Sequence, residues 1–200
     1  MLTVVVQAGG QSSRMGEDKA LKPFLGRPLI QRVIERLAPI ANEVVVTTNR
    51  PEAYAFLGLR LASDRIAGRG ALGGLHTALD AASTPLVAVV ACDMPFASAQ
   101  LMVHARELML ATDLDVVIPE STEGLEPLHA VYRRVTCLPA IVEAINADAW
   151  KVVSWFPKVK VRILSREECR PMTEDGLAFR NLNTPEEFAE GERRAREAGR

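Results

Sequence analysis

A glycine-rich, basic segment directly follows an apolar run near the start of the chain. The run Val4–Val6 leads into Gly9–Lys19, which holds three glycines and the cations Arg14 and Lys19. Glycine tolerates positive φ, so several peptide N–H groups can point at one anion, and the two cations add positive charge. This combination predicts a loop that binds the phosphates of a nucleoside triphosphate.

The spacing excludes two better-known phosphate loops. A Walker A loop requires G-x-x-x-x-G-K-[ST], but Gly10 and Gly16 are one residue too far apart and Lys19 does not directly follow a glycine. The dinucleotide fingerprint G-x-G-x-x-G is also absent. The alternative is an ordinary turn from strand to helix with solvated basic side chains.

A carboxylate follows the most apolar run of the chain. Leu86–Ala91 predicts a buried, central strand, and Asp93 stands just beyond its carboxyl end. Open α/β sheets bind ligands outside the carboxyl ends of their strands, where a carboxylate near phosphates is a natural ligand for Mg²⁺. The alternative is an aspartate that only caps the next helix.

The segment from Gln7 to Leu21 resembles the signature loop of the molybdenum cofactor guanylyltransferases, members of the nucleotidyltransferase superfamily. The family form is L-A-G-G-x-S-x-R-M-G-x-D-K-A-L, so Gln7 replaces an apolar residue. Gly70–Leu75, Cys92–Pro95 and Asn181–Glu187 resemble three further family motifs in the same order. The resemblance therefore covers nearly the whole chain.

The resemblance implies a role for each matching residue. Lys19, Arg14 and Asp93 would be catalytic, and Asp93 would also hold Mg²⁺. Asn181 and Asn183 would bind the acceptor substrate. The nucleotide-binding residues would be Gln7, Ala8, Gly9, Gly10, Ser12, Lys19, Asp64, Gly70, Gly73, Gly74 and Asp93.

The resemblance also implies a fold and a reaction. The fold would be a three-layer, Rossmann-like α/β nucleotidyltransferase fold with a mostly parallel central sheet, in one domain over residues 1–200. The enzyme would transfer GMP from GTP to molybdenum-bound molybdopterin, release pyrophosphate and form the guanine dinucleotide cofactor. Mg²⁺ would be the cofactor, and molybdoenzymes or cofactor-delivery proteins would be partners. The attacking phosphate is already anionic, so positioning and charge would supply the catalysis.

Three alternatives stay open. A molybdopterin cytidylyltransferase tends to carry Ala-Ala-Gly in its loop, whereas Gly9–Gly10 and Asp18–Lys19 resemble the guanine branch. A sugar-phosphate nucleotidyltransferase is a broader alternative, against which Asn181–Pro185 favours a pterin acceptor. A binding protein without turnover would have less need of both Lys19 and Asp93.

Composition limits the other classes of function. The chain has 200 residues, of which 48% are hydrophobic, enough to bury a sizeable core. A net charge of -1 argues against a general nucleic-acid binder. The sequence starts without a signal-peptide pattern and has no apolar run of about 20 residues, so we expect a cytoplasmic protein without membrane association. Cys92, Cys137 and Cys169 lack the spacing of a disulfide framework or a zinc site.

The apolar pattern predicts alternating strands and helices. Strands are expected near residues 4–6, 44–48, 59–62, 86–91, 115–119 and 159–164, and helices near 28–37, 70–79, 98–110 and 135–146. The helix after Gly70 is expected to be amphipathic. Thr184, Pro185 and Glu187 predict a capping box at a last helix.

Two features have competing interpretations. A lone histidine such as His129 on a strand is more often structural than an acid or base, despite its suitable pKa. The aromatic stretch Lys151–Phe156 could contact a second substrate, but burial in the core is the commoner use of aromatic side chains. We predict the structural role in both cases.

Overall fold

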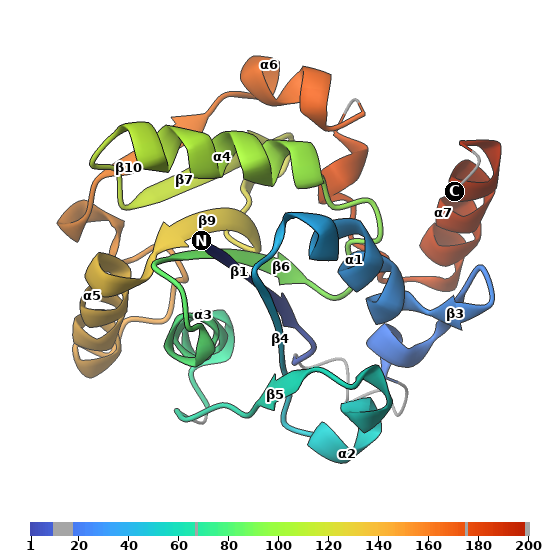
Figure 1. The fold of residues 1–200 in the computed structure, drawn as a ribbon, viewed down its shortest axis with the longest axis horizontal. Helices are drawn as coiled ribbons and strands as arrows, with labels where there is room; N and C mark the ends of the chain where they lie inside the picture. Colours follow the sequence, from blue (N-terminus) through green and yellow to red (C-terminus); the bar gives the residue numbers. More distant parts are fainter. Residues whose placement is uncertain (10–17, 67, 175, 199–200) are drawn as a thin grey trace.

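The computed structural model describes residues 1–9, 18–66, 68–174 and 176–198. Its centre is an eight-stranded mixed sheet with helices on both faces (Figure 1). The strands of this sheet are β1 (Leu2–Gln7), β4 (Glu43–Thr47), β5 (Arg60–Ala62), β6 (Leu86–Ala91), β7 (Val116–Ser121), β8 (Gly124–Leu125), β9 (His129–Arg133) and β10 (Val161–Leu164). The α-helices are α1 (Leu29–Leu37), α2 (Pro51–Tyr54), α3 (Gly70–Ala81), α4 (Ala99–Ala111), α5 (Arg134–Asn146), α6 (Arg166–Cys169) and α7 (Pro185–Glu197).

The strand order is β10-β7-β9-β6-β1-β4-β5, with β8 paired to β7. β1 pairs in parallel with β4 and with β6, whereas β9 is antiparallel to both β6 and β7. The prediction that the Leu86–Ala91 strand is central is therefore confirmed. Because β1, β4 and β6 point the same way, the residues that follow all three strands lie at one edge of the sheet.

The apolar runs of β1 and β6 are buried on both faces, as predicted for strands without polar alternation. Val4 and Val6 belong to the core on the side of α1 and α4. Val5 faces the opposite core, beneath α3 and α5. Because side chains alternate along a strand, each strand contributes to a core on both faces of the sheet. The result is three layers, with helices, the sheet and helices in turn.

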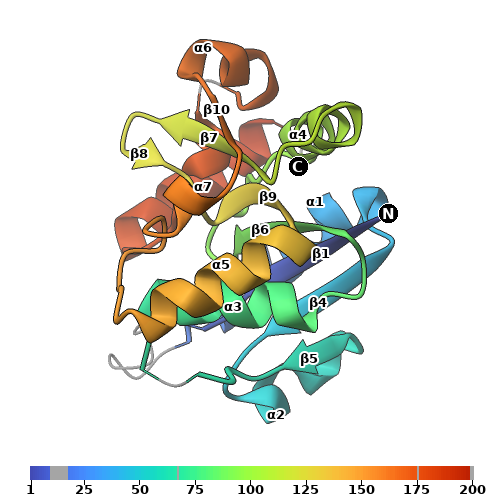
Figure 2. The same ribbon diagram turned by 90° about the vertical axis from the view of Figure 1, so that its left-hand side faces the viewer.

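The prediction of an amphipathic helix after Gly70 is wrong. α3 is buried over most of its length, on both the Leu75 side and the His76 side. Figure 2 shows the reason, since α5 lies along α3 and covers the face that would otherwise meet solvent. The hydroxyl of Thr77 donates to the carbonyl oxygen of Gly73 at 3.1 Å, which satisfies one polar group inside this layer.

Other local predictions are confirmed. In the capping box of α7, Thr184 Oγ1 accepts from the backbone N–H of Glu187, while the Glu187 carboxylate accepts from the backbone N–H of Thr184. Trp155 is fully buried and contacts the rings of Tyr132 and Phe156, so this aromatic stretch packs in the core. In the described part of the chain, every helix is too short or too polar to cross a membrane.

The apolar pattern does not predict several short elements, among them a small hairpin outside the main sheet. β2 (Pro23–Phe24) and β3 (Arg27–Pro28) form a separate two-stranded hairpin whose turn residues, Leu25 and Gly26, both have positive φ. Positive φ at both positions suits a tight hairpin turn. Strands of two residues are too short to produce a detectable alternation.

Candidate active site

A cavity of about 400 Å³ opens at the carboxyl edge of the sheet, and we call it the edge cavity. Its walls come from the ends of β1, β4 and β6, the turn before β9, and the segment before α7. The lining residues are Gln7, Ala8, Gly9, Asp18, Thr48, Asn49, Arg50, Ala91, Cys92, Asp93, Met94, Glu126, Pro127, Leu128 and Asn181. Its place matches the position at which parallel α/β sheets bind their ligands.

Asp93 supplies a carboxylate to this cavity. Burial raises the pKa of its carboxyl group, and the nearby Lys19 ammonium partly offsets this by favouring the ionised form. The Asp93 carbonyl oxygen accepts a hydrogen bond from the backbone N–H of Leu182 at 3.0 Å. This bond ties the segment that carries Asn181 and Asn183 to the end of β6.

Lys19 and Asn183 are in direct contact. The Lys19 Nζ donates to Asn183 Oδ1 at 2.9 Å, across most of the sequence. Asn181 lines the edge cavity, and its Oδ1 atom is buried without a hydrogen-bond partner among the described residues. The two predicted acceptor-binding asparagines thus differ, because one orients the predicted catalytic lysine and the other leaves an acceptor atom unsatisfied.

Asp18 anchors the start of this lysine segment. Its side chain accepts from the backbone N–H of Ala20, from the Tyr54 hydroxyl at 2.6 Å and from the Arg50 guanidinium. Asp18 thereby caps the 3₁₀ turn Lys19–Leu21 and connects it to α2. The backbone of Lys19 is fixed by these contacts, so that its ammonium group can be held in one place.

Asn49 is a site residue that the family resemblance did not supply. Its Nδ2 donates to Asp64 Oδ2 at 2.8 Å, and the backbone N–H of Asp64 donates to Asn49 Oδ1 at 2.9 Å. Asn49 lines the edge cavity, whereas the predicted residue Asp64 stands behind it. The available signal was its position at the carboxyl end of β4, beside the end of β1.

The predicted glycines of α3 do not line the edge cavity. A Cβ on Gly73 would lie 2.9 Å from the Arg69 Cβ, and a Cβ on Gly74 would lie 3.3 Å from Gln7 Oε1. Gly70 opens the helix with a φ of +54°, a conformation that favours glycine. Gly73 and Gly74 therefore have packing roles and Gly70 has a conformational one, while a direct role of the three in nucleotide binding stays a prediction.

Gln7 lies between α3 and the edge cavity. Its side chain is only 7% exposed, and its Nε2 atom is buried without a partner among the described residues. A buried amide donor without a partner costs about 1–3 kcal/mol. The close approach of Gly74 holds this amide at the cavity wall, beside the predicted nucleotide-binding residues Ala8 and Gly9.

His129 has a structural role, as predicted. It is 1% exposed, and its Nε2 accepts a hydrogen bond from the backbone N–H of Ser98 at 2.9 Å. Burial lowers its pKa to about 4, so the ring is neutral near pH 7.

Three of the predicted site residues, Gly10, Ser12 and Arg14, lie outside the described residues.

The donor set at Asp93 fits one kind of metal site. Among the described residues, no group of three or more His, Cys, Asp and Glu side chains could hold an ion by itself. Mg²⁺ is commonly held by one or two carboxylates together with substrate phosphates. Asp93, a single carboxylate in a cavity that Gly9 and Asp18 also line, fits an ion that binds together with substrate phosphates.

Comparison with known protein families shows to which family this chain belongs. Residues 4–159 match the model of the MobA-like NTP transferase domain. The chain belongs to this family. The matched range contains β1, β4, β5, β6 and the edge-cavity residues up to Leu128.

Relatives of this MobA-like chain carry the name molybdenum cofactor guanylyltransferase, some of them as probable members. It is 40% identical over 187 residues to a probable molybdenum cofactor guanylyltransferase from Pelotomaculum thermopropionicum, covering 93% of this chain and 89% of the relative. It is 34% identical over 192 residues to the molybdenum cofactor guanylyltransferase from Desulfosudis oleivorans, covering 96% of this chain and 94% of that relative.

Solved structures show the same architecture as this MobA-like domain. Molybdopterin-guanine dinucleotide biosynthesis protein A from Archaeoglobus fulgidus superposes with a TM-score of 0.81 at 26% identity, covering 98% of this chain and 99% of that one. 4-Diphosphocytidyl-2C-methyl-D-erythritol synthase from Anaerococcus prevotii superposes with a TM-score of 0.72 at 9% identity and 98% coverage of each chain, which shows the fold alone. The predicted α/β nucleotidyltransferase fold is confirmed.

Proposed function

We propose that this chain is a molybdenum cofactor guanylyltransferase. It transfers GMP from GTP to molybdenum-bound molybdopterin, releases pyrophosphate and forms the guanine dinucleotide cofactor. The observation that carries the proposal is that Asp93 and Asn181 line one edge cavity. The Lys19–Asn183 pair lies beside this cavity without lining it, and the Lys19 ammonium is close enough to Asp93 to favour its ionised form. Those residues stand in the motifs that resemble the guanylyltransferases, and the relatives named above carry that name.

The reaction needs no protein nucleophile. An oxygen of the acceptor's terminal phosphate attacks the α-phosphorus of GTP, a new P–O bond forms, and the bond from the α-phosphorus to the bridging oxygen breaks. That bridging oxygen leaves with the β- and γ-phosphates as pyrophosphate. The chain's task is to bring two anions together in line and to stabilise the added charge.

Lys19 is placed for the charge that develops on the phosphates. The hydrogen bond to Asn183 and the anchoring of Asp18 fix both ends of this residue before substrate binds. A preorganised cation costs no reorganisation during the reaction, and removing one such donor typically slows turnover by about 10²–10³-fold. Asn183 is therefore a positioning residue for Lys19.

Asp93 is the residue that would hold Mg²⁺. When bound there, the ion would neutralise phosphate charge as a Lewis acid. Burial of Asp93 opposes its negative charge, so a cation at the carboxylate would relieve that cost. Asp93 also lines the same cavity as Asn181, which supports a shared site for the nucleotide and the acceptor.

Two further residues of the edge cavity, Asn49 and Gln7, would bind the nucleoside part of GTP. The reciprocal Asn49–Asp64 pair presents a fixed amide at the end of β4. Gln7 adds an amide donor that lacks a protein partner among the described residues. Both groups can hydrogen-bond to a base or a ribose, which would satisfy Gln7 Nε2 only when ligand is bound.

Thermal unfolding with GTP, ATP, CTP and UTP, each with and without Mg²⁺, tests the proposal. A ligand at 100 times its Kd stabilises the native state by about 2.7 kcal/mol, which corresponds to a Tm increase of about 5–10 °C for a chain of this size. We expect this increase in Tm only for GTP in the presence of Mg²⁺. An increase for CTP instead would assign the cytidylyl branch, and no increase for any nucleotide would contradict the proposed GTP site.

A further inference from the structure

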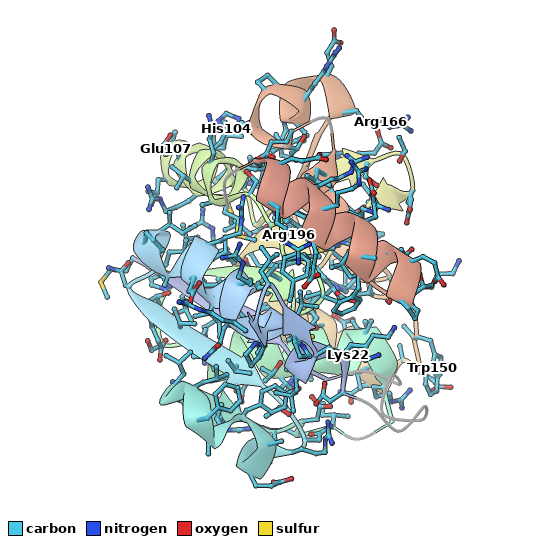
Figure 3. The ribbon with its side chains drawn as sticks, turned by 90° about the vertical axis from the view of Figure 1, so that its right-hand side faces the viewer. Lys22, His104, Glu107, Trp150, Arg166 and Arg196 are labelled. Atoms are coloured by element: carbon cyan, nitrogen blue, oxygen red, sulfur yellow. The ribbon has the colours of Figure 1, made fainter. Side chains whose placement is uncertain are left out.

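A second and larger cavity adjoins the edge cavity. Its volume is about 790 Å³, and we call it the hairpin cavity because the β7–β8 hairpin forms one wall. α6, the 3₁₀ turns Arg170–Met172 and Leu177–Phe179, and one residue of α7 form the others. In Figure 3, Arg166, a lining residue at the start of α6, is labelled in the upper part of the molecule.

Two connections join the cavities. Glu126 lines both of them. Asn181 lines the edge cavity, and the preceding residue, Arg180, lines the hairpin cavity. These two points come from segments far apart in the sequence, so a ligand in the hairpin cavity can extend past Glu126 toward Asn181 and Asp93.

The volumes indicate one substrate for each cavity. Small-molecule sites commonly have volumes of about 300–1,000 Å³ and enclose most of one ligand. The edge cavity, at about 400 Å³, can take the nucleotide. A transferase that joins two substrates needs a second space which opens onto the same phosphates, and the hairpin cavity is that space among the described residues.

Glu126 is held rigidly where the cavities meet. Its backbone N–H donates to the Pro119 carbonyl oxygen at 3.0 Å, and its own carbonyl oxygen accepts from the backbone N–H of His129 at 3.0 Å. Burial raises the pKa of its carboxyl group, Ser121 opposes this by hydrogen bonding, and Glu123 adds to the rise. A partly buried carboxylate of this kind gains most from a ligand that donates hydrogen bonds to it.

Arg180 and Phe179 provide the other groups that an anionic ring would need. The Arg180 guanidinium lies close enough to Glu187 to help lower the pKa of that carboxyl group, but it forms no hydrogen bond or ion pair with any described residue, so its N–H donors are available to an anion. Phe179 is 8% exposed, and its ring packs edge-on against His129 with centroids 5.3 Å apart. The cavity thus combines a carboxylate, a cation and an aromatic surface.

We propose that the hairpin cavity binds the ring portion of the acceptor, with Glu126 and Arg180 as its specificity-determining residues. The Glu126 carboxylate accepts hydrogen bonds from the amino and ring N–H groups on the pyrimidine edge of the pterin. Arg180 faces the anionic substituents on the other side of the ring. The terminal phosphate of the acceptor then reaches the edge cavity beside Asn181. This inference rests on the proposed function.

A stable fluorescent pterin, 6-carboxypterin, provides a direct binding test on the whole chain. We expect binding, followed by fluorescence anisotropy, that persists in the presence of saturating GTP and Mg²⁺. Glu126→Gln and Arg180→Gln should each weaken binding at least about tenfold, because each removes a charge-assisted hydrogen bond. Glu107→Gln on α4 and Arg27→Gln on β3, whose side chains are 63% and 62% exposed, are the matched controls and should bind normally.

A second readout separates this inference from the proposed function. In the transfer reaction, the Glu126 and Arg180 variants should show a raised KM for molybdopterin and a KM for GTP within about twofold of wild type. Displacement of the pterin by GTP, or wild-type pterin affinity in both variants, would overturn the inference. Turnover by the wild-type chain would in that case still support the proposed function. A wild-type chain that makes no dinucleotide would overturn both.

Discussion

The edge cavity and the hairpin cavity are built by different means. β1, β4 and β6, which are neighbours in the middle of the sheet, end at the edge cavity, and their hydrogen bonds continue past the strand ends at Ala8 and Cys92. The hairpin cavity is enclosed by the end of β7 and the turn that follows it, by a four-residue helix, by 3₁₀ turns and by one residue of α7. The residues proposed for chemistry are thus fixed by the sheet, whereas those proposed for acceptor recognition are fixed by local turns.

This difference indicates how the two sites can change. A substitution at the edge cavity disturbs strand ends that support both cores. Most residues of the hairpin cavity lie outside the two cores, with Cys169 and Phe179 as exceptions. We therefore expect variants of Asp93 and Lys19 to lose turnover and variants of Glu126 and Arg180 to lose acceptor affinity. The following variants test that division.

The largest loss of turnover is expected for Asp93→Asn. Removing the carboxylate that would hold the metal should lower kcat by about 10³-fold or more, because it acts on charge that develops in the transition state. Burial raises the Asp93 pKa in the folded state, so its ionised form disfavours folding at neutral pH. The variant should accordingly be at least as stable as wild type at pH 7 in urea unfolding.

Asp113→Asn is the control for this variant, since Asp113 is an exposed carboxylate paired with Lys160. It should keep the wild-type kcat. Near-normal turnover of Asp93→Asn would show that Asp93 is not catalytic. It would also contradict the assignment of the chemistry to the edge cavity.

Lys19→Ala should lower kcat by about 10²-fold, and Asn183→Ala by about tenfold, because Asn183 acts through the position of Lys19. The double variant should be no slower than Lys19→Ala alone. Steady-state rates of the three variants test this coupling. Additive losses would show that Asn183 has a role independent of the lysine.

Gly74→Ala tests the packing between α3 and the edge cavity. A methyl group there would lie 3.3 Å from Gln7 Oε1, so the amide must move. We expect KM for GTP to rise a few-fold with kcat little changed, which steady-state kinetics can resolve. Combining it with Gln7→Ala should add no further loss, and an additive effect would place the role of Gly74 elsewhere.

Glu43, at the amino end of β4, should affect stability and leave activity unchanged. Although burial raises its pKa, hydrogen bonds from Ser83, Thr3 and Arg60 outweigh this and hold the pKa at about 2. A lowered pKa in the folded state stabilises the protein above about pH 4.5, and that contribution disappears as the pH falls toward 2.

Glu43→Gln should therefore reduce the free energy of unfolding at pH 7 by about 1–3 kcal/mol and flatten its decline between pH 4.5 and 2. Urea unfolding at several pH values measures both effects, with Glu52→Gln on α2 as an exposed control. A variant with the pH dependence of wild type would refute this assignment, and altered kcat would contradict the separation of stability from the site.

Much of the edge cavity could be predicted because its signals are local. The apolar runs of β1 and β6 fix two buried strands, and the strand direction then places Ala8 and Asp93 at one edge. The contact between Lys19 and Asn183 could not be read from the pattern, since 164 positions separate the two residues. Motif resemblance assigned both to the site without showing that one orients the other.

The failures share a physical cause. The residues of α3 alone predict an amphipathic helix with one face in solvent. In the folded chain, α5 covers that face. The hairpin cavity was not anticipated because β8 has two residues and α6 has four, too few to produce a periodic pattern. Tertiary packing and short elements are the information that single-segment patterns lack.

The most direct test of the central claim is anaerobic incubation of the wild-type chain with Mg²⁺, molybdenum-bound molybdopterin and either GTP or CTP. Dinucleotide and pyrophosphate are quantified together. The account predicts that GTP gives the guanine dinucleotide and one equivalent of pyrophosphate, with little product from CTP. Product from CTP in preference to GTP, or no pyrophosphate with either nucleotide, would contradict it.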